Sequence, residues 1–288
     1  MTPRRQSLVA LLVPLGACGI DVGYGGTSYR CEGGVCPAGQ ACVQGRCVRP
    51  GSVADAAPPD AIARVADGLV VYYPFDEGSG ATVTDRSGVG VPLDLSIDDP
   101  DAVAWGVGVL AVAAPTLIRS PGPATKIVEA CLVTSEITLE AWVRPANVTQ
   151  GGPARLVTLS VDTSNRNFQL GQELDAYYQA RLRTTLSTSA NGSPFLATPE
   201  GAGDVRPELT HLVFTRDAAG QRRIYVDNVL RAADTFGGDF STWETSWSMA
   251  LANEHTFDRT WLGEYHLVAI YSRALSAEEV ARNHAAGP

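Results

Sequence analysis

Apolar and polar residues alternate strictly along Ile137–Arg144, and this period of two predicts a strand with one buried face. The apolar positions are Ile137, Leu139, Ala141 and Val143, and the positions between them are Thr138, Glu140, Trp142 and Arg144. Pro145 follows and ends the stretch, because proline cannot donate a ladder hydrogen bond. A strand of this kind cannot bury its apolar face alone, so the rest of the chain must supply a facing sheet.

Further apolar runs that end in turn residues predict more strands on both sides of this one. They are Gly68–Asp76, Val91–Ile97, Val103–Ala113, Ile127–Val133, Arg155–Val161, Asn167–Gln172, Tyr177–Thr185, Leu209–Thr215, Arg223–Asp227, Ser248–Leu251 and Thr260–Ser272. Asp227 and Asn228 both tolerate left-handed backbone, which favours a tight hairpin turn after the Arg223 strand.

The pattern predicts one helix, Ala277–Ala285, at the end of the chain. Ser276 and Glu279 have the spacing of a capping box, in which each side chain satisfies a free amide of the first turn. Strands and helices do not alternate, which excludes a doubly wound parallel sheet. The chain is therefore predicted to be all-β, a sandwich or jelly roll of two antiparallel sheets with a short C-terminal helix.

The first residues have the form of an export signal. Arg4 and Arg5 precede an apolar run, Leu8–Leu15, that is too short to span a bilayer. The run ends in Leu15-Gly16-Ala17-Cys18, which resembles the bacterial lipobox. The resemblance implies a lipoprotein signal peptide over residues 1–17, cleavage before Cys18 and lipidation of its thiol, with Gly19 favouring the outer membrane. An ordinary signal peptide with a coincidental cysteine is the alternative.

Residues 18–48 form a segment rich in cysteine and glycine. Cys31, Cys36, Cys42 and Cys47 are closely spaced in an exported segment, which predicts two disulfides with three connectivities left open. Zinc is the rival ligand, but no Cys-x-x-Cys pair and no nearby histidine support it. Residues 49–66 are rich in proline and alanine and read as a linker, and residues 67–288 form the main domain.

Composition narrows the functional classes. The net charge is −9 and the pI is about 4.9. Nucleic-acid binding requires a basic surface that neutralises phosphates, so an acidic balance disfavours it. The lipid on Cys18 is the one expected membrane contact.

Four stretches together resemble the concanavalin A-like, laminin-G-like jelly-roll family. They are residues 70–80 with 85–88, residues 137–145, residues 209–228 and residues 261–285. The resemblance covers about residues 67–287 and implies a jelly-roll β-sandwich. The chain departs from the family pattern at His266 and Leu267, where adjacent acids are usual, and this departure places any inherited metal site in doubt.

The resemblance also implies a candidate calcium site. Family members often hold Ca²⁺ near the opening strands, and Asp76 and Asp85 match those positions. Carboxylate oxygens from loops suit this ion, which accepts irregular geometry. The alternative is that both aspartates cap turns, as aspartate commonly does.

Catalytic patterns are incomplete. Laminarinase-like hydrolases of this fold place two carboxylates in Glu-x-Asp-x-x-Glu, and cleavage with retention needs the pair about 5 Å apart. Glu173 and Asp175 begin such a pattern, but Tyr177 and Tyr178 follow where the second glutamate should be. No Gly-x-Ser-x-Gly motif occurs either. Cys131 lies in an apolar run and is predicted to be a buried, unreactive thiol.

Aromatic residues in or near polar segments are candidate sugar platforms, because a ring face can receive a sugar while polar neighbours bind its hydroxyls. The candidates are Trp142, Tyr177, Tyr178 and Trp243. The alternative is that these rings pack under loops or between the sheets.

We therefore expect a non-enzymatic cell-envelope lipoprotein, attached to the outer membrane through its lipid, whose jelly-roll domain binds carbohydrate or a surface protein. A glycoside hydrolase or polysaccharide lyase on the same fold, or a purely structural envelope protein, are the alternatives. The functional part of this expectation rests on analogy of fold.

Overall fold

The computed structural model describes Cys36, residues 40–43, residues 46–48 and residues 62–288. The chain divides into two compact units, Met1–Asp60 and Ala61–Pro288. Cys18 and the predicted signal peptide lie outside the described residues, so their roles remain predictions. Among the residues that are described, no helix has both the length and the apolar character needed to cross a membrane.

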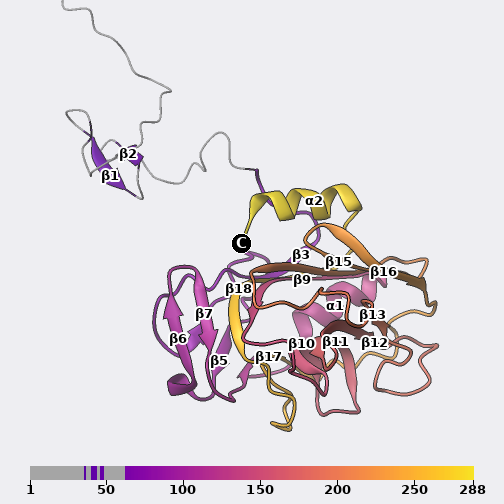
Figure 1. The fold of residues 1–288 in the computed structure, drawn as a ribbon. Helices are drawn as coiled ribbons and strands as arrows, with labels where there is room; N and C mark the ends of the chain where they lie inside the picture. The colour runs from indigo at the N-terminus through magenta and orange to yellow at the C-terminus, as the bar shows by residue number, and fades with distance from the viewer. Residues whose placement is uncertain (1–35, 37–39, 44–45, 49–61) are drawn as a thin grey trace, which may run out of the picture. The chain divides into compact units, whose positions relative to one another are not determined.

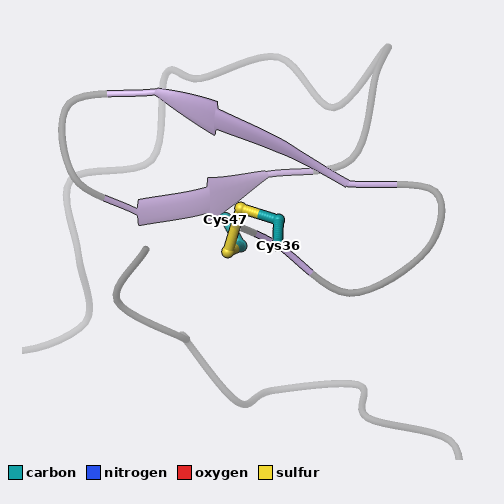
Figure 2. The surroundings of a disulfide bond; sticks show 2 residues. All are labelled: Cys36 and Cys47. Carbon is teal, nitrogen blue, oxygen red and sulfur yellow. A yellow bond between two sulfur atoms is a disulfide. The ribbon is translucent and has the colours of Figure 1, made fainter. Parts of the chain in front are cut away.

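The N-terminal unit contains a small antiparallel hairpin of β1 (Ala41–Val43) and β2 (Arg46–Val48). A disulfide joins Cys36 to Cys47 on β2, with the two Cα atoms 5.5 Å apart (Figure 2). Disulfide bonding in this segment is thus confirmed for one pair. The other predicted pair involves Cys31, which lies outside the described residues, so the full connectivity stays a prediction.

The main unit consists of two antiparallel sheets that face each other (Figure 1). The β10 sheet has the order β13-β12-β11-β10-β17-β8-β5-β4. Its strands are β4 (Thr82–Val83), β5 (Leu95–Ile97), β8 (Ile118–Arg119), β10 (Ala154–Ser160), β11 (Arg166–Glu173), β12 (Tyr177–Leu182), β13 (Leu196–Ala197) and β17 (Ser248–Leu251).

The β9 sheet has the order β16-β15-β14-β9-β18-β7-β6, and β3 pairs with the second half of β18. Its strands are β3 (Leu69–Tyr73), β6 (Val103–Gly106), β7 (Val109–Val112), β9 (Ile137–Pro145), β14 (Thr210–Arg216), β15 (Gln221–Val226), β16 (Val229–Thr235) and β18 (Gly263–Tyr271). The short 3₁₀ helix η2 (Pro100–Ala102) leads into β6. The predicted all-β sandwich of two antiparallel sheets is confirmed.

The main hydrophobic core lies between the two sheets. Alternate residues of the strands point into it, such as Leu139 and Val143 from β9, Leu170 from β11 and Leu251 from β17. This alternation leaves the intervening residues of each strand on the outer face of its sheet. The outer faces are therefore where a function of the domain has to be sought.

Helix α2 (Ala277–Ala286) covers the outer face of the β9 sheet (Figure 1). Leu275 and Val280 pack there in a second core that also contains Trp142 of β9 and Tyr271 of β18. The expectation that β9 has only one buried face is therefore wrong. Both faces are buried, because a helix more than 130 residues later in the chain lies over the face that carries the polar positions.

Residues Ile127–Val133, predicted as a strand, instead belong to helix α1 (Thr125–Thr134). Its buried residues are Ile127, Val128 and Cys131, and these fall on one side of a helix because Cys131 lies three and four positions after the other two. Ser135 ends the helix in the left-handed conformation and donates its N–H to the Cys131 carbonyl. The apolar run of this segment predicted a strand, but the segment forms a helix whose one apolar face packs against the core.

Two local signals in the sequence are confirmed. Ser276 accepts from the Glu279 amide and the Glu279 side chain accepts from the Ser276 amide, which is the predicted capping box. Asp227 and Asn228 both have positive φ and connect β15 to β16 in the predicted tight turn. Both signals lie in neighbouring residues, so a short stretch of sequence was enough to predict them.

Candidate functional site

The predicted aromatic platforms are mostly buried. Trp142 is only 7% exposed and stacks against two neighbouring histidine rings, with centroids 4.7 Å from His211 and 5.5 Å from His284. Trp243 stacks on Phe240 at 4.3 Å. These two tryptophans therefore have their faces occupied by protein, as the packing alternative supposed.

The two tyrosines differ from each other. Tyr178 is fully buried in the main core, and burial raises the pKa of its phenol well above the usual value. Tyr177 is half-buried at the start of β12, opposite Glu173 of β11. A sugar platform requires an exposed ring face, so the ligand roles expected of Trp142, Tyr178 and Trp243 have to be corrected. Ligand binding by Tyr177 stays a prediction.

The two candidate calcium ligands have protein partners. Asp85 is buried and accepts from the backbone amides of Tyr72, Ser87 and Leu93, and its Oδ2 lies 2.5 Å from Lys126 Nζ. Burial by itself would raise the pKa of Asp85, but these hydrogen bonds, led by that of Lys126, hold it below the usual value.

Asp76 forms an exposed ion pair with Arg86 at 3.2 Å. Because the oxygens of Asp85 already accept from four donors, including an ammonium group, this donor set does not fit a divalent cation. The described part of the chain also has no cluster of three or more histidine, cysteine, aspartate or glutamate side chains placed to hold a metal ion. Calcium binding elsewhere stays open to experiment.

A hollow opens on the outer face of the β10 sheet. It has a volume of about 360 Å³ and is lined by Ser96, Asp98, Arg119, Ser120, Pro121 and Ser248. These residues come from β5, β8 and β17 and from the segments that follow β5 and β8. The flanking residues Leu95, Ile97, Ile118 and Met249 point the other way, into the core, which fixes the polar residues on the outer face.

The hollow presents both donors and acceptors of hydrogen bonds. Arg119 Nε donates to Asp98 Oδ1 at 3.1 Å, and both side chains are partly exposed. The hydroxyls of Ser120 and Ser248 donate to the Gly122 carbonyl at 2.7 and 3.0 Å. Ser96 is exposed and makes no side-chain hydrogen bond within the described chain. A ligand with several hydroxyl groups, each of which both donates and accepts, matches this lining.

A buried ionic cluster joins Arg155 and Ser160 of β10 to Glu254, in the segment after β17. Arg155 Nε donates to Glu254 Oε2 at 2.9 Å, and both side chains are buried. Ser160 donates its hydroxyl to Glu254 Oε1, and the His255 amide donates to the same oxygen at 3.1 Å. Burial lowers the pKa of Arg155, and Glu254 opposes that effect. Both carboxylate oxygens are therefore used within the protein.

Sequence reasoning did not find the residues of this hollow. A weak signal exists, because Leu95-Ser96-Ile97 and Ile118-Arg119 alternate apolar and polar positions. These strands are very short, however, and their pairing joins residues that are more than 100 positions apart, as in Arg119 opposite Ala250. No local pattern specifies which short strands become neighbours.

A sequence model of the concanavalin A-like lectin/glucanases superfamily matches residues 122–281 of this chain. That match covers more than half of the chain and includes both central strands, β9 and β18, and the start of α2. No curated protein sequence matches the chain.

Solved structures with a similar fold include sugar-bound and protein-bound domains. Domain 4 of the GH43 extracellular arabinanase AbnA from Geobacillus stearothermophilus, in complex with arabinotriose, has a TM-score of 0.53 at 19% identity, over 76% of this chain and 98% of that chain. Trypanosoma rangeli sialidase in complex with sialic acid has a TM-score of 0.54 at 14% identity, over 75% of this chain and 32% of the sialidase chain.

The binding domain of botulinum neurotoxin DC in complex with rat synaptotagmin II has a TM-score of 0.55 at 10% identity, over 77% of this chain and 52% of that chain. This chain thus spans about half of the toxin domain and about a third of the sialidase. At these identities the likeness concerns the fold.

Proposed function

Because the chain belongs to the concanavalin A-like lectin/glucanases superfamily, we propose that it is a non-enzymatic binding module whose ligand is a carbohydrate, held on the outer face of the β10 sheet. The observation that carries this proposal is the hollow lined by Ser96, Asp98, Arg119, Ser120 and Ser248. Its serine hydroxyls, carboxylate and guanidinium together supply donors and acceptors in the mixture that sugar hydroxyls require.

Binding without turnover is supported by the carboxylates of this face. Of the described residues that line the hollow, Asp98 alone carries a carboxylate, and this carboxylate accepts a hydrogen bond from Arg119. The nearby Glu254 is tied to Arg155 and Ser160. Glycoside hydrolysis by the usual route uses two carboxyl groups that flank the scissile bond. This arrangement favours recognition over the hydrolase alternative.

The structural relatives agree with a carbohydrate ligand, since one is solved with arabinotriose and another with sialic acid. The botulinum neurotoxin binding domain, about half of which this chain spans, is solved in complex with synaptotagmin. A protein ligand is therefore the second candidate. The polar lining of the hollow favours the sugar, because the centre of a protein–protein interface is usually more apolar than the rest of the surface.

We further propose that the module acts in the cell envelope as an outer-membrane lipoprotein anchored through Cys18. The sequence Leu15-Gly16-Ala17-Cys18 after a short apolar run supports this location. Metabolic labelling with radioactive palmitate tests it, with Cys18→Ser as the matched variant. Label in the native chain and none in the variant is the expected result, and an unlabelled native chain would contradict the proposal.

The binding proposal is tested with the mature chain on a glycan microarray, followed by calorimetry on each hit. We expect at least one glycan to bind, and we expect Arg119→Ala to weaken its binding by about 10- to 100-fold, since a hydrogen bond to a charged group contributes about 1.5–3 kcal/mol. Arg86→Ala removes the same charge from a surface pair with Asp76 and should leave the affinity unchanged.

Turnover is followed on the same glycans by the release of reducing ends and of unsaturated products. The proposal expects neither. Release of either product would support the hydrolase or lyase alternative. Absence of any glycan binding would overturn the carbohydrate proposal.

A further inference from the structure

The outer face of the β10 sheet gathers arginines at the end opposite the hollow. One row of directly opposed residues crosses the sheet, and its members are Ser96, Arg119, Ala250, Thr158, Gln169 and Arg181. With strands about 4.8 Å apart, this row spans about 24 Å. The hollow lies at its first two residues, and Arg181 on β12 lies at its far end.

Arg166 on β11 and Arg181 on β12 lie toward that far end, and the carboxylates of Asp162 and Glu173 act on them only through space, without a direct ion pair. Arg155 has a carboxylate partner, Glu254. Arg166 donates instead to the backbone carbonyls of Thr163 and Asn191, which carry no net charge.

The environment of Arg166 penalises its charge. Burial is the largest cause, and the charge of the nearby Arg155 adds to it, so the pKa of Arg166 falls to about 9. Glu254 acts in the other direction but does not compensate. An anionic group brought to this end of the face would reduce the repulsion among the guanidinium groups.

Gln169 lies in this group with its amide unpartnered. Its side chain is fully buried, and neither Oε1 nor Nε2 has a hydrogen-bond partner. Arg166 Nε is likewise buried without a partner. Buried polar atoms are nearly always hydrogen-bonded in folded proteins, so an unpartnered amide beside two arginines points to a polar group supplied from outside the chain.

Arg181 is partly exposed, and hydrogen bonds fix the position of its guanidinium group. Its Nε donates to Gln179 Oε1 at 2.7 Å, and its Nη1 donates to Asn191 Oδ1 at 3.2 Å and to Ser193 Oγ at 3.1 Å. Its guanidinium lies 4.9 Å from the ring of Phe195, which is 44% exposed. The remaining nitrogen, Nη2, has no hydrogen bond to the described residues, and the residue is partly exposed.

We infer that Arg181, with Arg166 and Gln169 behind it, forms a subsite for the carboxylate group of an acidic sugar. This inference rests on the proposed carbohydrate function and specifies its substrate class. Nη2 of Arg181, which has no hydrogen bond to the described residues, can donate charge-assisted hydrogen bonds to a carboxylate. Arg166 adds charge from a position that solvent does not screen, and Gln169 offers an amide donor.

The inference is tested with two pairs of probes that differ in charge and share the sugar backbone. One pair is a galacturonan hexamer and its methyl ester, and the other is sialyllactose and its methyl ester. Calorimetry on the mature chain should give at least tenfold tighter binding for the acid than for the ester in one pair. That preference should shrink as salt is raised, because screening weakens the charge contribution.

Two variants locate the effect. Arg181→Gln should remove the preference for the acid over the ester. Arg86→Gln, which changes the net charge equally, should keep the preference. Equal binding of acid and ester in both pairs, or an unchanged preference in Arg181→Gln with an unaltered melting temperature, would overturn the subsite. If Arg181→Gln melts early, the salt dependence of the native chain decides, and no dependence would overturn it.

The two proposals fail in different ways. Binding of neutral glycans with no preference for acids leaves the carbohydrate function standing and removes the acidic subsite. Absence of binding to every glycan on the array removes both.

Discussion

Glu140 Oε1 lies 2.8 Å from His211 Nε2 beneath helix α2, where neither side chain is exposed to solvent. A carboxylate only accepts hydrogen bonds, so His211 Nε2 is the donor. The other oxygen, Oε2, accepts from Asn283 Nδ2 at 2.8 Å and from the Tyr271 hydroxyl at 3.2 Å. Arg64 pairs with Oε1 from the segment that precedes β3.

This network joins three distant parts of the chain. Arg64 also donates to the Gly287 carbonyl after α2, and Val65 donates its amide to Asn283 Oδ1 on that helix at 2.8 Å. Glu140 is thus the shared partner of strand β9, the entering segment and the C-terminal helix. The network explains why a glutamate is tolerated at a position without solvent.

Substitution of Glu140 should therefore destabilise the main domain strongly. Glu140→Gln leaves Arg64 without its carboxylate in a mostly buried position, and loss of one member of a buried pair costs about 3–5 kcal/mol. Unfolding in urea measures the change. Glu264→Gln is the matched control, because Glu264 pairs with Arg144 on the surface and should change the free energy of unfolding by less than about 1 kcal/mol. Equal effects would show that the network contributes little.

The stability of the domain should fall with acidification in two steps. Burial lowers the pKa of His211, and although Glu140 opposes this, the net shift is downward. The contribution of His211 to the free energy of unfolding is complete above its unfolded pKa of about 6.5. This contribution is lost as the pH falls toward the lower pKa of His211 in the folded state. Unfolding in urea at pH 7 and pH 5 should show the decrease.

The second step belongs to Glu140. Burial acts to raise its pKa, but the His211 hydrogen bond and the charge of Arg64 prevail and lower it. The contribution of Glu140 to the free energy of unfolding is present above its unfolded pKa of about 4.3 and is lost as the pH falls below that value.

Two histidine variants test the first step. His211→Gln should flatten the change in the free energy of unfolding between pH 7 and pH 5, whereas His266→Gln, on a partly exposed side chain, should not. An identical slope in both variants would rule out His211 as the source.

Calcium should not stabilise the domain through Asp85. Four donors already occupy its oxygens, and one of them is the ammonium of Lys126. A ligand that binds only the native state raises the melting temperature, so the midpoint in millimolar Ca²⁺ should equal the midpoint in a chelator. A clear rise that Asp85→Asn abolishes would refute this assignment.

Local sequence signals predicted the fold well where neighbouring residues decide the structure. The capping box of Ser276 and the turn at Asp227 needed no distant contact. The alternation of β9 gave the strand but not its surroundings. Glu140 and Trp142 occupy polar positions in the pattern, yet they are buried because α2 packs over them.

The residues of the candidate site could not be predicted from the sequence, for a related reason. Ser96, Arg119 and Ser248 line the hollow together, but only the pairing of short strands brings them to one face. Single aromatic residues such as Trp243 gave a stronger signal in sequence, and the structure uses that ring for packing against Phe240. Chemical type alone did not distinguish an exposed platform from a core residue.

Cys131 should not react with thiol reagents in the native protein. Its side chain is fully buried on α1, and burial raises the pKa of its thiol far above the usual value, which suppresses the reactive thiolate. Labelling with iodoacetamide at neutral pH, followed by peptide mapping, should find this cysteine unmodified until the domain is unfolded in denaturant. Rapid labelling of native protein would mean that α1 opens readily.

The central claim is that the outer face of the β10 sheet is the binding surface. Chemical-shift mapping of the mature chain with its best glycan from the array tests this claim most directly. We predict that the amides of Ser96, Arg119 and Ser248 shift on titration, whereas those of Asn283 on α2 and Val229 on β16 do not. Shifts confined to α2 or to β16, with none around Arg119, would contradict the account.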